Sequence, residues 1–209
     1  MATLVDYFNK GGSMMWLLLI LAIIGLAFII ERIISLFIML KGNPKQMLEE
    51  VIKKIEAQGI DAALAYLRKE KSPLAKVLEA GLEKVDKGRI VVEEAMAMKA
   101  TAEFAFLDRG MIYLQAVATL APIIGFLGTV TGMIKAFTAI AAAGEVEPTI
   151  VASGISEALI TTATGLLIAA PVALFYAIFA DRVNNFTRGM EKASNAFIDY
   201  LVETGVLER

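Results

Sequence analysis

The chain has 209 residues and a net charge of -2, and 57% of its residues are hydrophobic, giving a mean hydropathy of +0.66. An apolar share above the usual range of about 45–50% excludes an ordinary soluble domain and indicates a membrane protein. The small net charge argues against nucleic-acid binding, and the absence of His and Cys excludes disulfides, Cys/His zinc sites, thiol nucleophiles and imidazole bases.

The first apolar run extends from Met14 to Leu40 and is interrupted only by Glu31 and Arg32. At about 1.5 Å per residue, a helix of this length spans a bilayer with some to spare. No small-residue cleavage site follows the apolar residues, so we expect a retained helix and not a cleaved signal peptide. Residues 14–40 are therefore predicted as the first transmembrane helix, after a short outer segment at residues 1–13.

The segment after the first run has helical periodicity with clear start and stop signals. Pro44 is suited to the first turn of a helix that Gly59 ends, and Ser72 with Pro73 predicts another helix start. Gly88 then separates these helices from a long stretch, from Ile90 to Ala143, in which only Gly110, a few glycines of the apolar run and Pro122 interrupt the helical pattern. This continuity predicts that the second span extends well into the cytoplasm.

The second and third apolar runs occupy residues 111–143 and 150–180, and only the acidic turn 144–149 separates them. So short a connection predicts an antiparallel hairpin of two transmembrane helices. Residues 181–209 form a predicted C-terminal helix. Its apolar side chains at spacings of three and four predict packing within the subunit, or alternatively on neighbouring subunits: Val183, Phe186, Met190, Ala193, Phe197 and Tyr200.

Positive charge gives the expected orientation. Thirteen Lys and Arg residues lie between Lys41 and Arg109 and four between Arg182 and Arg209, whereas the turn 144–149 has none. By the positive-inside rule, residues 41–110 and the C-terminal tail are cytoplasmic, and the N-terminus and the turn are outside. The predicted fold is all-α: a polytopic membrane protein with three transmembrane helices, two of them extended into a helical cytoplasmic region.

Small residues recur on one face of each helix of the hairpin. The face of the second span carries Gly125, Thr129, Gly132 and Ala136, and the face of the third carries Gly154, Ala158, Thr162, Gly165, Ala169 and Ala173. Small side chains permit close helix contact in lipid, and hydroxyl groups at membrane depth need a polar partner or water. The two faces therefore predict either helix packing or the lining of a path.

A second polar stripe on the third span is formed by Glu157, Thr161 and Thr164. A carboxylate at membrane depth is costly, so Glu157 is expected at a water-accessible or subunit-interface position, or near enough to the outer surface to stay hydrated. Lys135 can pair with Glu157, although extension to the surface is the preferred prediction. Pro122 predicts a kink in the second span.

The runs Ala121–Met133 and Gly154–Leu166 closely resemble the signature helices of the MotA/TolQ/ExbB proton-channel family, and ExbB most of all. The resemblance extends over nearly the whole chain. It implies a homopentamer in the bacterial inner membrane, with no cofactor, around the single-span helices of an ExbD-like dimer that supplies a protonatable aspartate. Thr129 and Thr162 match the pore threonines of the family and would face that aspartate, and Glu157 matches its acidic position.

The function implied is that of an ExbB-like subunit, not an enzyme, which uses the proton-motive force with ExbD-like and TonB-like partners to energise transport across the outer membrane. A TolQ-like subunit remains an alternative within the family. A membrane scaffold whose small-residue faces serve only packing is the alternative from another class. An intramembrane hydrolase is disfavoured because Ser153 and Ser156 have no His or nearby Lys as a base.

Overall fold

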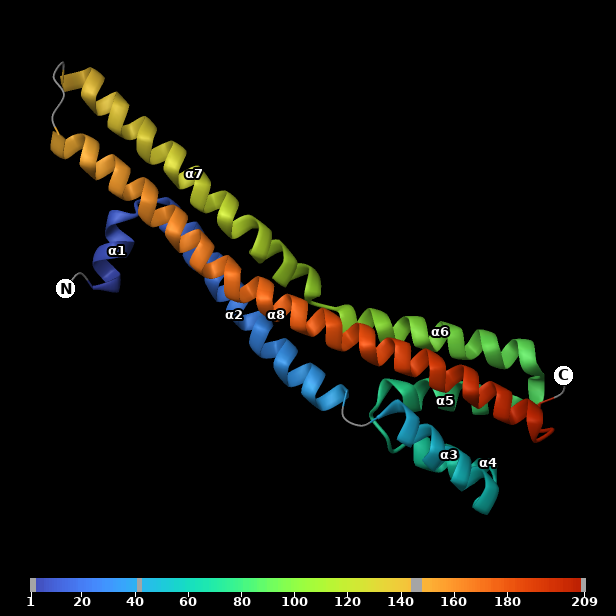
Figure 1. Cartoon of the computed structure of the whole chain (residues 1–209). Helices are drawn as coiled ribbons and strands as arrows, with labels where there is room; N and C mark the ends of the chain where they lie inside the picture. The colour runs from blue at the N-terminus through green and yellow to red at the C-terminus, as the bar shows by residue number, and fades with distance from the viewer. Residues whose placement is uncertain (1–2, 41–42, 144–147, 208–209) are drawn as a thin grey trace. The chain divides into compact units, whose positions relative to one another are not determined.

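The computed structural model describes residues 3–40, 43–143 and 148–207, and every regular element among them is helical (Figure 1). The elements in chain order are α1 (Leu4–Lys10), α2 (Met14–Met39), α3 (Pro44–Gln58), α4 (Ile60–Leu67), α5 (Pro73–Leu82), η1 (Val85–Lys87), α6 (Arg89–Asp108), α7 (Met111–Ala143) and α8 (Pro148–Glu203). The all-α prediction is thus confirmed. Most of the turn predicted at 144–149 lies outside the described residues.

Three helical stretches of the described residues are long and apolar enough to cross a membrane. They lie at Met14–Leu36, Arg89–Ala142 and Pro148–Glu203, and their most apolar windows have mean hydropathies of 2.7, 1.8 and 2.1. Many large apolar side chains on α2, α7 and α8 are exposed within the single chain, which is expected for surfaces that face lipid. The polytopic prediction is therefore confirmed, and its orientation stays a prediction.

The chain divides into two compact units. The first contains residues 1–31 and 110–178, so it consists of α1, most of α2, α7 and the first part of α8. Gly25 of α2 is where these helices converge, because a Cβ at this position would lie 3.0 Å from Val172 Cγ2 and 3.2 Å from Val117 Cγ1. Phe28 of α2 also stacks on Tyr113 of α7, with ring centroids 4.5 Å apart. The first unit is therefore a three-helix bundle.

The second unit contains residues 32–109 and 179–209, and its core is centred on α5. Most side chains of α5 are buried against neighbouring elements of the unit. Glu103 of α6 is buried as well, and its carboxylate pairs with Lys76 of α5 at 2.9 Å. The C-terminal stripe predicted from the sequence is buried here from Val183 to Phe197, as its intrasubunit alternative predicts, and Tyr200 is partly exposed.

The helix boundaries follow the local signals in the sequence. Asn43 caps α3 by accepting a hydrogen bond from the Lys45 amide at 3.0 Å, and Pro44 occupies the first turn. Gly59, with a φ of 83°, ends this helix. Ser72 occupies the N-cap position of α5, although its side chain makes no capping hydrogen bond.

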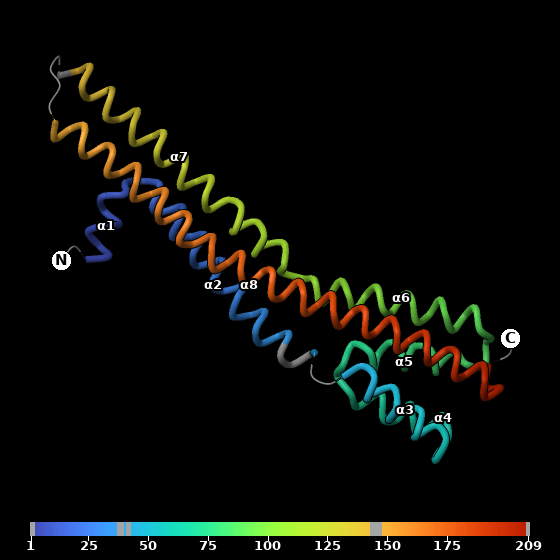
Figure 2. The backbone as a smooth tube through the Cα atoms, in the orientation of Figure 1, coloured from blue at the N-terminus to red at the C-terminus, as the bar shows by residue number. Residues whose placement is uncertain are grey.

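The helical pattern between residues 90 and 143 is broken at Gly110, one of the interruptions noted in the sequence, so the second span does not continue beyond this point as one helix. Arg109 leaves the helical conformation with a ψ of 124°, and Gly110 has a φ of 94°, so α6 and α7 are separate helices. Gly110 permits a left-handed conformation that other residues rarely adopt. In contrast, α8 is uninterrupted from Pro148 to Glu203 and joins the predicted third span to the predicted C-terminal helix (Figure 2).

Candidate functional site

The backbones of α7 and α8 are in contact along their small-residue faces. A Cβ at Gly125 would lie 2.9 Å from the carbonyl oxygen of Thr161, and one at Gly165 would lie 2.5 Å from the carbonyl oxygen of Ala121. Distances this short leave no space for a side chain at either position. These two glycines therefore permit the close approach of the hairpin helices.

The same contact continues toward the other end of the hairpin. A Cβ at Gly132 would lie 3.0 Å from the carbonyl oxygen of Gly154 and 3.1 Å from the amide nitrogen of Ala158. Of the small residues predicted as a lumen wall or packing face, Gly125, Gly132, Ala158 and Gly165 thus meet in the α7–α8 interface. Ala169 is buried in a cluster with Met15 and Leu18 of α2 and Ala121 of α7.

Within these faces, the two threonines are less buried than one neighbour of each in sequence. Thr161 is fully buried, whereas Thr162 is partly exposed. On α7 the buried residue is Gly128, and Thr129 is partly exposed. A Cβ at Gly128 would overlap the side chain of Thr161, so these two positions form a complementary pair across the helices. Gly128 was not among the predicted site residues, although its spacing between Gly125 and Gly132 could have indicated it.

The two threonines predicted to line the pore make different hydrogen bonds. The Thr162 hydroxyl donates across the interface to the carbonyl oxygen of Gly125 at 3.0 Å. The Thr129 hydroxyl donates to the carbonyl oxygen of Phe126 in its own helix at 2.6 Å. Thr162 therefore contributes to the packing of α7 on α8. Thr129 makes no such contribution through its hydroxyl, and the proton-pathway role of both stays a prediction.

The secondary candidates on α8 have their hydroxyls satisfied by their own helix. Thr161 donates to the carbonyl oxygens of Glu157 and Ala158 at 3.1 and 2.9 Å, and Thr164 donates to that of Ile160 at 2.7 Å. Such local bonds satisfy a hydroxyl in an apolar environment without a partner helix. Pro122, the remaining candidate, lies within α7, where it cannot donate to the carbonyl a turn earlier.

Glu157 is paired with Lys135. The Lys135 ammonium donates to Oε1 of Glu157 at 2.5 Å, which joins α7 to α8 by an ion pair. The Glu157 side chain is 19% exposed and that of Lys135 is 55% exposed. Extension of Lys135 to the surface was the preferred prediction, and the structure instead shows the alternative. The pair lines a cavity of about 370 Å³ together with Ser153 and Thr149.

A third segment reaches Glu157 from the N-terminal side. Gly12, just before α2, has a φ of 69°, and a Cβ at this position would overlap the Glu157 carboxylate. A side chain at Gly12 would therefore be both strained and obstructed. Three parts of the chain thus meet at the Glu157 carboxylate: Gly12 before α2, Lys135 of α7, and α8 itself. Within the described residues, no group of His, Cys, Asp or Glu side chains is arranged to hold a metal ion.

These features define a multi-pass α-helical membrane protein with a closely packed hairpin and an ion pair between its helices. The profile of the MotA/TolQ/ExbB proton channel family matches residues 69–192, which is more than half of the chain. The chain therefore belongs to this family, and the resemblance found from the signature helices is confirmed.

Individual relatives agree with the family match. A putative biopolymer transport protein ExbB homolog of Methanothermobacter thermautotrophicus is 28% identical over 183 residues, covering 88% of this chain and 65% of that protein. An ExbB-like 1 protein of Synechocystis is 34% identical, covering 79% of this chain and 66% of that protein. The Tol-Pal system protein TolQ of Haemophilus influenzae is 37% identical over 131 residues, covering 63% of this chain and 54% of that protein. The chain thus spans about two thirds or less of these relatives.

Proposed function

We propose that this chain is an ExbB-like subunit of an inner-membrane motor driven by the proton-motive force. In this proposal, several copies, five by the family resemblance, surround the single-span helices of an ExbD-like partner that supplies an aspartate. The motor acts on a TonB-like protein and energises transport across the outer membrane. The N-terminus is outside, the second unit is cytoplasmic, and the chain has no enzymatic role.

The observation that carries this proposal is the contact between α7 and α8. Because their backbones meet at Gly125, Gly132, Gly154 and Gly165, the contacted stripe has no room for water between the two helices of one chain. A proton path would therefore have to run along the faces of α7 and α8 that point away from this contact, and other chains would have to complete its wall. Thr129 is partly exposed on α7, and Glu157 lines the cavity at the edge of the hairpin, so both are accessible to such chains.

Thr129 provides the sharpest test because its hydroxyl bonds only within its own helix. We expect Thr129→Val to lower proton flux through liposomes carrying the complex by about tenfold, the effect of losing one hydrogen bond of about 1.4 kcal/mol to the protonated carrier. Thr129→Ser keeps the hydroxyl and should keep most of the flux. Thr162→Val is less informative, since it also removes the bond to Gly125.

Thr119→Val is the matched control for this experiment. Thr119 is exposed on the same helix, and its hydroxyl makes the same kind of local bond, to the carbonyl oxygen of Gln115 at 2.9 Å. Its replacement should leave flux unchanged. If Thr129→Val and Thr119→Val conduct equally in complexes of unchanged composition, the hydroxyl has no part in conduction and the scaffold alternative gains support.

A TolQ-like role remains the second candidate, because TolQ of Haemophilus influenzae is among the similar proteins. The two roles differ in the partner and not in the proposed pathway. Complementation of strains that lack either system separates them: growth on a substrate that requires TonB supports the first role, and restored outer-membrane integrity supports the second.

A further inference from the structure

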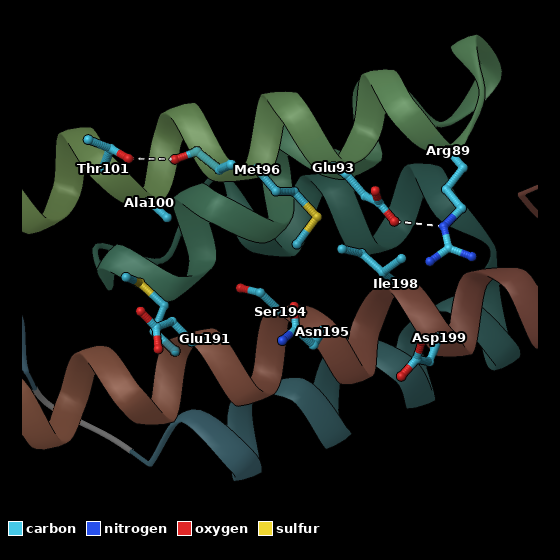
Figure 3. Close-up of a pocket in the computed structure, with 12 residues that line it drawn as sticks. Arg89, Glu93, Met96, Ala100, Thr101, Glu191, Ser194, Asn195, Ile198 and Asp199 are labelled. Carbon is cyan, nitrogen blue, oxygen red and sulfur yellow. Dashed lines mark hydrogen bonds and ion pairs between the residues drawn. The ribbon is translucent and has the colours of Figure 1, made fainter.

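A groove lies between α6 and the C-terminal part of α8, within the second unit (Figure 3). It has a volume of about 660 Å³, and small side chains form part of its lining: Ala97, Ala100 and Thr101 of α6 and Ser194 of α8. A second cavity of about 260 Å³ adjoins it at Thr187 and Phe104 and shares part of its lining. We call the two cavities together the α6–α8 groove. Because many of the lining side chains are small, the backbone of a bound peptide can approach both helices.

The lining of the groove is acidic. Its carboxylates belong to Glu93 of α6 and to Glu191 and Asp199 of α8, and Arg89 is the only basic residue among the described residues that line it. Arg89 pairs with Glu93 at 2.6 Å. Within the described part of the chain, Glu191 and Asp199 form no ion pair, although Asp199 lies near Arg89 at one end of the groove (Figure 3). Two basic residues of α8 are exposed outside the lining: Arg188 and Lys192. The groove is therefore suited to a cationic occupant.

The groove also contains buried hydroxyl groups that lack a partner. The hydroxyl oxygens of Ser194 and Thr187 are buried, and neither has a hydrogen-bond partner among the described residues. Figure 3 shows Ser194 between α6 and α8. Buried polar atoms without partners are uncommon in complete interfaces, so an occupant with hydrogen-bonding groups is expected. A peptide backbone supplies an N–H and a C=O group at each residue. The hydroxyls thus indicate a ligand independently of the carboxylates.

The groove has the length of a short extended peptide. Thr187 and Asp199 line its two ends, and they are separated by about 18 Å along the uninterrupted helix α8, at about 1.5 Å per residue. An extended chain of about five or six residues has this length, at about 3.3 Å per residue. The Thr187 end is the one nearer in sequence to the predicted third span, and Phe104, which is 38% exposed, adds apolar surface there.

We propose that the α6–α8 groove binds a short basic segment at the cytoplasmic end of the single-span partner. The inference rests on the proposed function, which supplies both the partner and the cytoplasmic location of the second unit. By the positive-inside rule, residues that flank a transmembrane helix on its cytoplasmic side are rich in Lys and Arg. These side chains pair with Glu191 and Asp199, and the backbone of the segment forms hydrogen bonds with the hydroxyls of Ser194 and Thr187. The partner is then held in the second unit as well as in the membrane.

Peptide binding to the full chain without its partner tests this site. The chain is reconstituted in nanodiscs of phosphatidylcholine, which carries no net charge, and is titrated with a short fluorescent peptide in which Lys and Arg alternate with small residues. We expect saturable binding that weakens as the salt concentration rises from about 0.05 M to about 0.5 M, because salt screens exposed charges. The same peptide with Glu in place of Lys and Arg should not bind.

Substitutions in the groove locate the binding site. Glu191→Lys should weaken binding of the basic peptide by about fivefold, because it replaces the attraction of an exposed pair with a repulsion of similar size. Glu49→Lys is the matched control, since Glu49 is exposed on α3 of the same unit and lines neither cavity. It should leave the affinity unchanged. Ser194→Ala should weaken binding by about two- to tenfold, the effect of one hydrogen bond.

Cysteine cross-linking tests the contact in the assembled complex without background, because the chain has no cysteine. Asn195 is exposed and lines the groove. The Asn195→Cys chain is expressed with a partner that carries one Cys among its cytoplasmic basic residues, and the membranes are oxidised. We expect a disulfide between the two chains. Lys53→Cys, at an exposed position on α3, should give a much lower yield.

Three results would overturn the inference. The first is that the peptide does not bind to the unchanged chain, which would leave the hydroxyls to ordered water. The second is equal binding by the Glu191→Lys and Glu49→Lys chains. The third is linking of Asn195→Cys to another copy of this chain in preference to the partner, which would place a second copy in the groove. If native mass spectrometry still detects the partner and proton flux is normal, the proposed function stands and only the docking site fails.

Discussion

At the scale of single residues, the ion pair with Lys135 gives the Glu157 carboxylate a charged partner within the chain. An unpaired carboxylate in that position would be costly, whereas a partner on α7 and access to a cavity reduce the cost. The same pair fixes α7 against α8 close to Gly12. Glu157 therefore holds two helices together, and a role in proton movement would come in addition to this contact.

The two contributions of Glu157 can be separated with a double-mutant cycle. Glu157→Gln and Lys135→Met should each lower thermal stability, and the double variant should lose less than the sum, with a coupling of about 0.5–1 kcal/mol because Lys135 is largely exposed. If Glu157 also serves conduction, the double variant regains stability but not proton flux. Additive losses would contradict the pairing in the assembled protein, and recovered flux would restrict Glu157 to a structural role.

At the scale of the elements, the break between α6 and α7 is held by a residue from another helix. Arg32 of α2 is buried, and its Nη1 donates to the carbonyl oxygen of Leu107 at 3.0 Å. Leu107 lies in the last turn of α6, where carbonyl groups have no partner within the helix. Arg32 thus satisfies a free carbonyl group at the C-terminal end of α6, just before Gly110.

Replacing Arg32 tests this contribution. We expect Arg32→Met to keep most of the buried volume but to leave the Leu107 carbonyl without this donor, at a cost of about 1–3 kcal/mol in thermal unfolding. Hydrogen exchange should increase at the end of α6. Arg68→Met is the control, because Arg68 is exposed and pairs with Glu79 and Glu83 at the surface. Equal losses for both variants would mean that the Leu107 contact adds nothing.

Local signals explain which elements could be predicted. Pro44 and Gly59 predicted the bounds of α3, because capping and positive φ are properties of a few neighbouring residues. The sequence did not show whether Gly110 ends a helix, since one glycine inside a helical pattern is compatible with either a continued helix or a break. The tertiary contact of Arg32 with Leu107 accompanies the break here, and a contact over 75 residues is invisible to a local pattern.

In the candidate site, too, local signals predicted part of the structure and tertiary contacts determined the rest. The composition of the small-residue faces predicted that α7 and α8 could meet closely, which they do at Gly125 and Gly165. Periodicity alone did not indicate which of two adjacent residues is more deeply buried at the level of the threonines. There the fully packed pair is Gly128 with Thr161, while Thr129 and Thr162 are partly exposed. Choosing between these neighbours requires the relative register of two helices.

At the scale of the whole molecule, the single chain leaves much apolar surface uncovered. Many large apolar side chains of α2, α7 and α8 are exposed in one copy, so lipid or further chains must cover them. The chain belongs to a proton-channel family, and the close contact of α7 with α8 leaves no space for water along the contacted stripe of one chain.

Co-expression with single-span proteins that carry a transmembrane Asp tests the assembly directly. We expect native mass spectrometry to detect a complex of several copies of this chain, five in the proposed form, with two copies of the partner. A partner with Asp→Asn should assemble equally and lose proton flux by tenfold or more, about the loss of one charge-assisted hydrogen bond. Detection of this chain alone with every partner would contradict the motor proposal.

The unbroken course of α8 limits how the length of this protein can vary. One buried stripe runs along the helix through Gly154, Thr161, Ala169, Val183 and Phe197, with small residues first and large ones after. An insertion of one residue would turn everything beyond it by about 100°. Only changes of about 7, 11 or 18 residues return the stripe to nearly the same side. An insertion or deletion within α8 is therefore expected to keep both ends of the stripe on the same side only when it adds or removes nearly whole turns.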